Sequence, residues 1–481
     1  MFNVSSEREE RLEQVRNLRE RDEAFAYNYE RTHRVQEILE FDQSDDLPER
    51  SFSTAGRVME LRNFGDLVFL DLRGETAQIQ LIVRNQQEAL EKVEDLHRGD
   101  IIGVEGTLTY TNSGEFSLEV QDLDVLTSGV RSIPSDYFGI EDQELRYRDR
   151  PLNLVSDMQT RDNLRTRSNI IREIRNYLVE RNFMEVETPI IQPVYGGANA
   201  EPFVTHVNDL DMDSYLRISP ELYLKRLIIG GYERIFEIGK DFRNESIDTT
   251  HNPEFTMMEI YQAYADYQDM MELTEKLYEH VAVEITGSAQ LEYQDETLDF
   301  SAPWRRLTMR EAIEEYAGLD VTDFSNGEIQ QTLDQHGIEL DSGFERGLAI
   351  AELFEELVEE NLVQPVHITD HPEETTPLCM QHREKEGMIE RFESFAAGME
   401  LSNAYTELRD PIRQRELFEE EQRRQEMGDE EAHPIDMDFV NALELGMPPT
   451  AGLGIGIDRM VMLITDSKSI RDVITFPMMK N

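Results

Sequence analysis

The sequence predicts an α+β protein with a small β-rich domain near its start and a larger mixed domain after it. Between Ser51 and Val125, apolar residues alternate with other residues, and a period of two is typical of strands. After Arg161 the apolar period lengthens to that of an amphipathic helix. Strand-like and helix-like segments then follow one another to the end of the chain.

The composition is strongly acidic. The 481 residues include 47 Lys and Arg against 100 Asp and Glu, for a formal net charge of −53. At about 150 residues per domain, this length predicts about three domains. In dilute buffer the charge would repel nucleic acid, but at about 1 M salt the Debye length is only ~3 Å and the repulsion is screened. Only seven of the basic residues are Lys, so we favour a salt-adapted, halophilic protein over one that avoids nucleic acid.

Several classes of protein are not expected. The sequence has no run of about 18 apolar residues that could span a membrane. Its first residues lack the basic and apolar regions of a signal peptide, so we expect a cytoplasmic protein that binds no membrane. Cys379 is the only cysteine, which excludes an internal disulfide, and the His and Cys residues do not have zinc spacing.

The N-terminal elements follow from the same patterns. Residues 5–25 are dense in Glu and Arg with a thin apolar stripe, which predicts a surface helix. Several short strands separated by turns indicate a small sandwich or barrel, and five strands with a Greek-key return would make an OB-fold. The strands are predicted around Val68–Leu72, Ile79–Val83, 101–108 and 116–125.

In the second part, a helical pattern through Ile170, Ile174 and Leu178 leads to the strand-like run FMEVETPII, which Pro189 interrupts. Residues 270–350 are predicted to be mostly helical, with acidic faces. The chain ends with a glycine-rich segment and an amphipathic helix. Further strand-like segments are predicted at 215–218, 234–238, 366–369 and 440–443.

The segment 234–261 combines charged and aromatic groups on one predicted hairpin. Its loop holds Arg243, Glu245 and His251. If the second strand is extended, alternation places Phe255, Met257, Glu259 and Tyr261 on one face. Arg243 suits a phosphate or a carboxylate, and Phe255 offers a flat surface to a purine. An exposed hairpin with salt bridges would explain Arg243 and Glu245 alone, but not acidic and aromatic groups on one face.

Two later segments carry further candidates. In PPTAGLGIGIDRMVMLIT we expect a turn whose glycines Gly452, Gly454 and Gly456 let a ligand approach the backbone, followed by a helix that begins near Arg459. Neither the dinucleotide GxGxxG spacing nor the Lys-Ser/Thr of a P-loop is present. In RFESFAAGMELSNAYTEL, the carboxylates Glu393 and Glu400 could hold Mg²⁺ or be ordinary surface charges, and Asn403, Tyr405 and Glu407 would share one face if extended.

These segments together resemble the class II aminoacyl-tRNA synthetases. Residues 170–191, which end in EVETPII, are similar to motif 1, whose helix and strand form a dimer interface around Pro189. The hairpin and the glycine-rich segment are similar to motifs 2 and 3. The likeness to lysyl-tRNA synthetases runs essentially from the N-terminal helix to Asn481. It is carried by the strings GGANAEPF, SYLRISPELYLKRL, FRNESIDTTHNPEFTMMEIYQAYADY and GLGIGIDRMVML.

The resemblance implies a fold and a reaction. The fold is an N-terminal OB-fold β-barrel that reads the anticodon, then an antiparallel six-stranded catalytic sheet flanked by helices. The reaction is that of a lysine–tRNA ligase, in which ATP activates L-lysine to lysyl-adenylate and the lysyl group passes to the 3′ end of tRNA(Lys). The implied domains are a helical segment at 1–48, the OB-fold at 49–130, a linker at 131–160 and the catalytic domain at 161–481, with an insertion at about 270–350.

The resemblance also assigns residues. Arg243 and Arg459 would be catalytic. Up to three Mg²⁺ ions would accompany ATP on Glu393 and Glu400, and the enzyme would be a homodimer through motif 1. ATP would meet Arg243, Glu245, His251, Phe255 and Arg459. Lysine would meet Gly197, Glu221, Glu259, Tyr261, Asn403, Tyr405 and Glu407. A central anticodon uridine would meet Phe69, Gln80 and Glu115 in the β-domain.

The acidic pocket makes physical sense for lysine, because a buried ammonium needs carboxylate partners. An aspartyl- or asparaginyl-tRNA synthetase, the nearest alternative, would need a cation there instead. A paralogue that lysylates an elongation factor resembles only the catalytic domain, so the β-domain argues against it. A non-catalytic RNA-binding scaffold would not need Arg243 and the paired glutamates. Two positions depart from the family pattern, Pro151 in the connector and Glu201 after the glycines.

Overall fold

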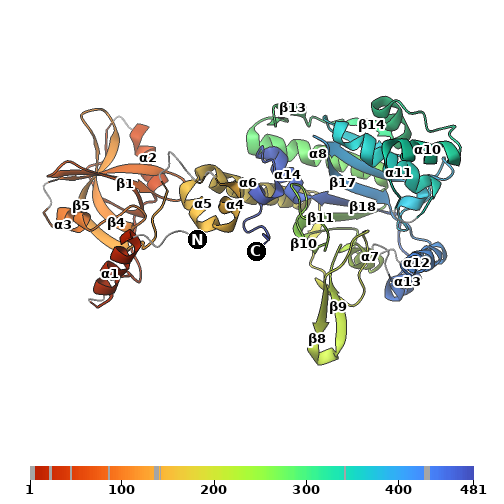
Figure 1. Cartoon of the computed structure of the whole chain (residues 1–481), viewed down its shortest axis with the longest axis horizontal. Coiled ribbons are helices and arrows are strands. Elements are labelled where there is room, and N and C mark those ends of the chain that lie inside the picture. The colour runs from red at the N-terminus through yellow and green to blue at the C-terminus, as the bar shows by residue number, and fades with distance from the viewer. Residues whose placement is uncertain are drawn as a thin grey trace. The chain divides into compact units, whose positions relative to one another are not determined.

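The computed structural model describes residues 6–20, 24–43, 46–84, 87–134, 140, 142–340, 343–426 and 434–480. The chain divides into two compact units, Met1–Arg161 and Asp162–Asn481 (Figure 1). Among the helices in the described ranges, none is both long enough and apolar enough to cross a membrane.

The first unit is built on a closed five-stranded barrel with the strand order β1-β2-β3-β5-β4. Neighbouring strands are antiparallel except β3 and β5, which are parallel. Closure of the barrel excludes the sandwich alternative and confirms the predicted OB-fold. The strands are β1 (Phe52–Asn63), β2 (Leu67–Arg73), β3 (Gln78–Arg84), β4 (Ile101–Tyr110) and β5 (Phe116–Thr127).

The predicted alternation places the right residues in the barrel core. Val68, Leu70 and Leu72 of β2 are buried together with alternate residues of β3. Pro151 lies in the first turn of its helix, where a missing N–H loses no hydrogen bond, so the helix accepts this departure from the family pattern. The helices of this unit are α1 (Ser6–Glu20), α2 (Val35–Leu39), a 3₁₀ turn (Glu40–Gln43), α3 (Gln87–Glu94), α4 (Gln143–Arg148) and α5 (Arg150–Ser156).

The second unit is built on an eight-stranded sheet with the order β14-β15-β16-β17-β18-β11-β10-β6. Its six strands from β15 to β10 are antiparallel, as the resemblance implies. The sheet has two strands more than the six expected, because β14 and β6 extend its edges in parallel. The strands are β6 (Met184–Glu185), β10 (Arg234–Phe242), β11 (Glu254–Ala263), β14 (Arg305–Thr308), β15 (Val366–Thr369), β16 (Arg391–Ala396), β17 (Met399–Thr406) and β18 (Thr450–Gly456).

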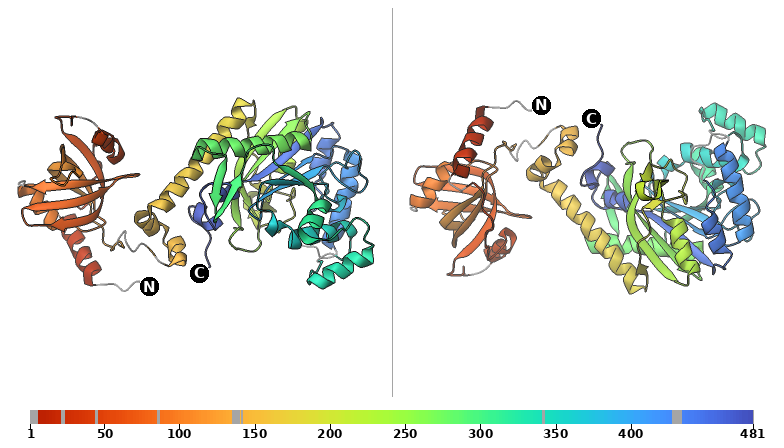
Figure 2. Two further views of the ribbon diagram at one scale, coloured as in Figure 1. Left: turned by 90° about the horizontal axis from the view of Figure 1, so that it is seen from above. Right: turned by 90° about the horizontal axis from the view of Figure 1, so that it is seen from below.

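The two faces of this sheet differ in chemistry. Met258 and Ile260 of β11 point into the main core, where they pack with residues of α6 (Met158–Glu180), α8 (Tyr267–Thr286) and α14 (Ile457–Ile464) (Figure 2). The residues between them point to the opposite face, beside α7 (Glu221–Ile229). One face therefore forms the core, and the other is free to form a site.

Smaller elements complete the unit. Strands β7 (Ile191–Gln192), β9 (Met212–Leu216) and β8 (Val204–Val207) form a three-stranded sheet, and β12 (Gln290–Tyr293) and β13 (Glu296–Asp299) form a hairpin. The remaining helices are α9 (Met309–Ala312), a π-helix (Ile313–Ala317), α10 (Asn326–His336), α11 (Arg346–Leu357), α12 (Pro411–Glu426), α13 (Met437–Leu443) and α15 (Ile470–Val473), with 3₁₀ turns at Asn208–Leu210, Glu359–Asn361 and Glu373–Thr375.

Two predicted elements are wrong. Residues 440–443, predicted as a strand, lie in α13, because Val440 and Leu443 are three residues apart and both pack in one apolar cluster with α7. The glycine-rich segment, predicted as a turn, is the strand β18, and α14 begins directly after it. Residues 270–350 contain the β12–β13 hairpin and β14 beside their helices.

Candidate active site

A cavity of about 370 Å³ lies against the open face of the sheet. The glycines of β18 form its floor, because Gly452 stands between Tyr261 and Tyr405, and Gly454 stands between their neighbours Glu259 and Asn403. A Cβ atom on Gly452 would lie 2.1 Å from Oε1 of Glu407 and 2.6 Å from a ring carbon of Tyr261. Glycine is therefore required here to leave room for the side chains around it.

One end of the cavity carries cations and a stacked ring. The guanidinium carbon of Arg243 lies 5.2 Å from the centre of the Phe255 ring. Nε of Arg243 is buried and has no hydrogen-bond partner among the described residues. Nη2 of Arg459, at the start of α14, lies 3.3 Å from Nε2 of His251. With Glu245, these residues line the cavity and suit an anionic ligand that carries an aromatic base.

His251 is held by its own loop. Its Nδ1 lies 2.8 Å from Oδ2 of Asp248, and its backbone N–H donates to the same carboxylate. Burial alone would raise the pKa of Asp248, but hydrogen bonds from His251 and Thr250 lower it to about 2. The ionised carboxylate therefore orients the His251 ring so that Nε2 faces Arg459.

The carboxylates Glu393 and Glu400 line the cavity beside these cations. Nη1 of Arg459 donates to the backbone carbonyl of Glu400 at 2.6 Å. Arg391, on the same strand as Glu393, donates to the Glu393 carboxylate at 2.5 Å and to Oδ1 of Asn403 at 3.1 Å. The structure therefore brings both predicted metal ligands to the end of the cavity that carries Arg243 and Arg459.

Two further acidic residues approach the same place and were not predicted. Burial and the charge of Glu393 raise the pKa values of Glu355 in α11 and of Glu359 in the following 3₁₀ turn, so both lie near Glu393. Burial raises the pKa of Glu359 to about 9, with help from Glu393 and Glu400. The chain has 100 acidic residues, and no local pattern distinguishes these two. They belong to a helix and a turn that are distant in sequence from the other residues of the site.

This crowding of carboxylates fits a divalent cation. Mg²⁺ prefers carboxylate oxygens and shares them with substrate phosphates, so it does not need a cage made entirely of protein ligands. Within the described residues, no three His, Cys, Asp or Glu side chains form such a cage. The donor set of Glu393 and Glu400 therefore fits a metal that arrives with a phosphate ligand.

The other end of the cavity is an acidic, hydrogen-bonded pocket. Oε1 of Glu259 accepts from Oγ of Ser219 at 2.7 Å, and its Oε2 accepts from the Tyr261 hydroxyl at 3.0 Å. The Tyr405 hydroxyl donates to Oε2 of Glu221 at 3.3 Å. Burial, and after it the charge of Glu221, raise the pKa of Glu259 well above its usual range. An ammonium ion in this pocket would restore the ionised form of Glu259.

The remaining predicted lysine-binding residues surround this pocket. Gly197 has a φ of 91°, and a Cβ there would lie 3.0 Å from Oγ of Ser219, so the backbone passes close to Glu221. Asn403 faces the cavity. Glu407 is fully buried on the same face of the sheet, where its Oε2 lies 2.5 Å from Nζ of Lys225. Glu201, the second departure from the family pattern, accepts the backbone N–H of Asn244 through its carbonyl at 2.8 Å.

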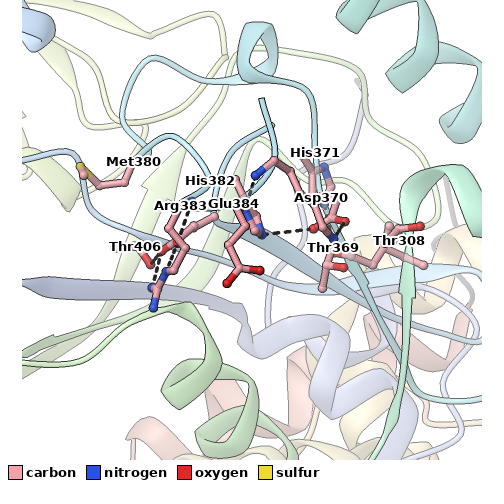
Figure 3. Close-up of polar contacts among 12 residues, drawn as sticks. Thr308, Thr369, Asp370, His371, Met380, His382, Arg383, Glu384 and Thr406 are labelled. Atoms are coloured by element: carbon pink, nitrogen blue, oxygen red, sulfur yellow. Dashed lines mark hydrogen bonds and ion pairs between the residues drawn. The ribbon is translucent and has the colours of Figure 1, made fainter. Parts of the chain in front are cut away.

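A polar cluster anchors the loop that closes one side of the cavity. In Figure 3, Asp370 and His382 face each other, with Nε2 of His382 3.7 Å from Oδ1 of Asp370. Nδ1 of His382 accepts the backbone N–H groups of Glu384 and Lys385 at 3.0 and 3.1 Å. Arg383 pairs with Glu390, which also accepts from Oγ1 of Thr406 at 2.7 Å. The segment between Asp370 and His382 includes residues 375–378, which line the cavity.

In the barrel, the predicted anticodon residues lie on the outer face. Phe69 and Asp71 alternate with the buried core residues of β2, and Asp71 stands opposite Gln80 of β3. Oε1 of Gln80 accepts from Oγ of Ser117 at 3.0 Å. Burial raises the pKa of Asp71, and the charge of Glu115 adds to this rise. Glu115, directly before β5, therefore lies near the same face.

The fold and this cavity define a class II tRNA synthetase with an OB-fold domain. Residues 142–480 match the family of class II tRNA synthetases (D, K and N), and residues 52–126 match the OB-fold nucleic acid binding domain. The sheet and the barrel described above occupy these two ranges.

Full-length relatives narrow the family. The chain is 44% identical to a lysine–tRNA ligase of Clostridium novyi over 98% of this chain and 94% of the relative. It is 46% identical to a lysine–tRNA ligase of Methanoculleus marisnigri, with the same two coverages. It is 48% identical to a lysine–tRNA ligase of Saccharolobus solfataricus over 98% of this chain and 97% of the relative. The chain therefore belongs to the lysine–tRNA ligases.

Proposed function

We propose that this enzyme binds ATP and L-lysine in the cavity and makes lysyl-adenylate there before it charges tRNA(Lys). The observation that carries the proposal is the polarity of the cavity. Cations and an aromatic ring stand at one end, and the glutamates Glu221 and Glu259 stand at the other. ATP is an anion with a flat base, and lysine carries two ammonium groups and one carboxylate, so the two substrates match opposite ends.

The residues supply position and charge, and none of them needs to act as a nucleophile. The lysine carboxylate attacks the α-phosphorus of ATP, a bond from carboxylate oxygen to phosphorus forms, and pyrophosphate leaves with its electron pair. Arg243 lies where the two substrates meet and stabilises the charge that develops on the α-phosphate. Phe255 and Glu245 hold the adenine, and Arg459 and His251 hold the distal phosphates. The 3′-terminal ribose hydroxyl of the tRNA then attacks the lysyl carbonyl and releases AMP.

Glu393 and Glu400 would hold the Mg²⁺ that accompanies ATP, and bound Mg²⁺ would neutralise charge on the β- and γ-phosphates. When Mg²⁺ is not bound, Arg391 keeps the Glu393 carboxylate oriented through a hydrogen bond of 2.5 Å. The protonation of Glu359 would respond to the bound cation, because burial and the surrounding carboxylates raise its pKa to about 9.

The direct test is ATP–pyrophosphate exchange with each of the twenty amino acids, in dilute buffer and in multimolar KCl. We expect exchange with lysine alone. Exchange with aspartate or asparagine would contradict the assignment of the pocket while leaving the fold intact. An absence of exchange at every salt concentration would contradict the proposal that the cavity activates an amino acid.

We propose that the outer face of the barrel binds the anticodon, with Phe69 stacking on a base and Gln80 and Glu115 supplying hydrogen bonds. Phe69 lies on the outer face of the barrel, and this supports the proposal because OB-folds bind single strands by stacking. Phe69→Ala should lower kcat/KM for tRNA about tenfold or more, because stacking contributes ~1–3 kcal/mol per base. Lysine-dependent exchange needs no tRNA and should not change, so a loss in both assays would contradict the role.

We propose a homodimer through the motif 1 region. Apolar side chains there are exposed in the single chain, including Val179, Met184, Ile190 and Ile191. Light scattering after size exclusion should give twice the chain mass of 56.0 kDa. Ile191→Glu should shift the enzyme to monomer, whereas Ile412→Glu, at a still more exposed isoleucine on α12, should not. A monomeric wild type would contradict the proposal.

We also propose the domain division 1–48, 49–130, 131–160 and 161–481, a cytoplasmic location with tRNA, and a salty interior for the host cell. The division is supported by the barrel strands, which run from Phe52 to Thr127, and by the unit boundary after Arg161. The location is supported by the use of tRNA and ATP as substrates. The halophilic assignment is supported by the net charge of −53.

A further inference from the structure

Lys225 is a fully buried lysine that the reaction described above does not use. Its Nζ lies 2.5 Å from Oε1 of Glu221 and 2.5 Å from Oε2 of Glu407. The Phe439 ring of α13 covers the same ammonium, with its centre 5.7 Å away. A lysine in such a place is tolerated only when carboxylates surround it, so its position depends on these two partners.

The sequence places Lys225 beside the pocket. It lies four residues after Glu221 in α7, and residues four apart share one face of a helix. The apolar neighbours Leu224 and Ile228 are buried with α13 and fix this face of the helix against the sheet. Glu407 reaches the same point from the end of β17, where its N–H donates to the carbonyl of Thr450 at 2.9 Å.

Glu407 connects this buried ion pair to the cavity. One oxygen, Oε2, faces Lys225, and the other, Oε1, has no hydrogen-bond partner among the described residues. Oε1 lies against Gly452 on the site face of the sheet, since a Cβ on that glycine would come within 2.1 Å of it. Gly452 and Tyr261 belong to the cavity wall. The unpartnered oxygen is therefore directed at the floor of the acidic pocket, and Lys225 is on its far side.

The charges in this region leave room for two ligand cations. Three carboxylates meet there, those of Glu221, Glu259 and Glu407, around one resident ammonium. Burial lowers the pKa of Lys225, but Glu221 and Glu407 outweigh burial and raise it above its usual value, so the lysine stays charged. When all three carboxylates are ionised, three negative charges and one positive charge leave two negative charges, which the two ammonium groups of free lysine would match.

We propose that Lys225 is a positioning residue for the recognition of lysine. It neutralises one of the three carboxylate charges and holds Glu407 so that its free oxygen faces the side-chain ammonium of the substrate. The proposal rests on the proposed function of the cavity, and it adds a residue that determines how many ammonium groups the pocket accepts.

The titration of Glu407 gives this role a signature that simple packing lacks. Burial raises the pKa of Glu407 to about 8 even though Lys225 opposes the rise. Without Lys225 the rise would be larger, so the loss of the Glu407 proton that lysine binding requires at pH 7 would cost more than in the wild type. Glu221 and Glu259 are the other acidic groups that face it. The pKa values of its neighbours Tyr261, Tyr405 and Cys379 are raised well above their usual values, so these groups stay neutral between pH 7 and 9.

The test compares Lys225→Met with wild type in lysine-dependent ATP–pyrophosphate exchange at pH 7 and pH 9. At pH 7 the KM for lysine should rise about thirtyfold or more, and the KM for ATP should change less than about twofold. At pH 9 the ratio of the lysine KM values of variant and wild type should fall about tenfold, because Glu407 ionises. Lys276→Met removes an exposed lysine that pairs with Glu272 at the same helical spacing, and it should change neither KM.

A double-mutant cycle tests whether Lys225 acts through Glu407. In a Glu407→Gln background, Lys225→Met should change the lysine KM less than about twofold, because the Glu407 carboxylate is gone and Glu221 is still held by the Tyr405 hydroxyl. If Lys225→Met alone does not fold, this double variant decides, since it leaves only Glu221 without its lysine partner and not Glu407 as well. A double variant with a clearly higher lysine KM than Glu407→Gln, or one that does not fold, would overturn the proposal.

Two results separate this proposal from the proposed function. If the wild type does not catalyse exchange with lysine, the function of the cavity is wrong. If the wild type does so and Lys225→Met raises the KM values for lysine and ATP equally, or by the same factor at pH 7 and pH 9, Lys225 is only a packing residue and the positioning role is wrong.

Discussion

At the scale of single residues, the most restrictive position in the site is Gly452. Its neighbours on the sheet, Tyr261 and Tyr405, and the buried Glu407 fill the space that a side chain would need. Overpacking of this kind costs about 1–3 kcal/mol. We therefore expect Gly452→Ala to lower kcat/KM for lysine about ten- to a hundredfold, with little change in the KM for ATP, as measured by pyrophosphate exchange.

Gly327→Ala is the matched control, because the nearest atom to a Cβ there lies 4.0 Å away. It should leave both kinetic constants unchanged. A Gly452→Ala enzyme with wild-type lysine kinetics would show that the floor of the pocket does not contact the substrate.

At the scale of elements, the segment that follows strand β15 carries a residue that makes the enzyme sensitive to acid. His371, two residues after the end of β15, is buried, and its Nε2 lies 3.1 Å from the carbonyl oxygen of Ile368. Burial, with the nearby Arg391, lowers the pKa of His371 to about 3. The unfolded chain binds this proton near pH 6.5. The unfolded state is therefore favoured progressively as the pH falls from 6.5 towards 3.

The expected contribution of His371 to this acid destabilisation is about 2 kcal/mol at pH 5. His371→Gln should lose correspondingly less stability than wild type between pH 7 and pH 5, as measured by urea unfolding. The exposed His336 offers a control, and His336→Gln should follow the wild type. Equal acid sensitivity in His371→Gln and wild type would mean that His371 is already protonated in the folded enzyme.

Alternation predicted some elements well and failed on others for physical reasons. The strand at 366–369 and the site face of β11 follow from period-two patterns, and both are present. Residues 440–443 are apolar enough for either element, and only packing against α7 makes them helical. The contributions of Glu355 and Glu359 depend on a helix that folds back onto the site, and short-range patterns do not report such contacts.

At the scale of the whole molecule, the acidic composition predicts a dependence on salt. At 0.1 M salt the Debye length is about 10 Å, and the net charge of −53 repels itself across the chain; at 1 M it is ~3 Å. The midpoint of urea unfolding should therefore rise with KCl up to multimolar concentrations. Sucrose, which stabilises compact states without screening charge, should not reproduce the full effect. A midpoint that is independent of KCl would contradict salt adaptation.

The sheet as a whole was predicted incompletely. The antiparallel centre of six strands follows the family resemblance, but β14 and β6 add parallel edges. Strand β6 is only two residues long, too short for a periodic pattern to identify. The strands of the barrel could be predicted because apolar and polar residues alternate strongly in them. Closure of the barrel could not, because it depends on the long-range pairing of β1 with β4.

The central claim is that the acidic end of the cavity recognises the side-chain ammonium of lysine. The most direct measurement compares kcat/KM in ATP–pyrophosphate exchange for lysine and for norleucine, which has the same chain length without the ammonium group. Leaving a buried carboxylate unpaired costs about 3–5 kcal/mol. We predict that norleucine is at least about a hundredfold poorer than lysine. Norleucine activity within about tenfold of lysine would contradict the account, because the glutamates would then not be paired with the substrate.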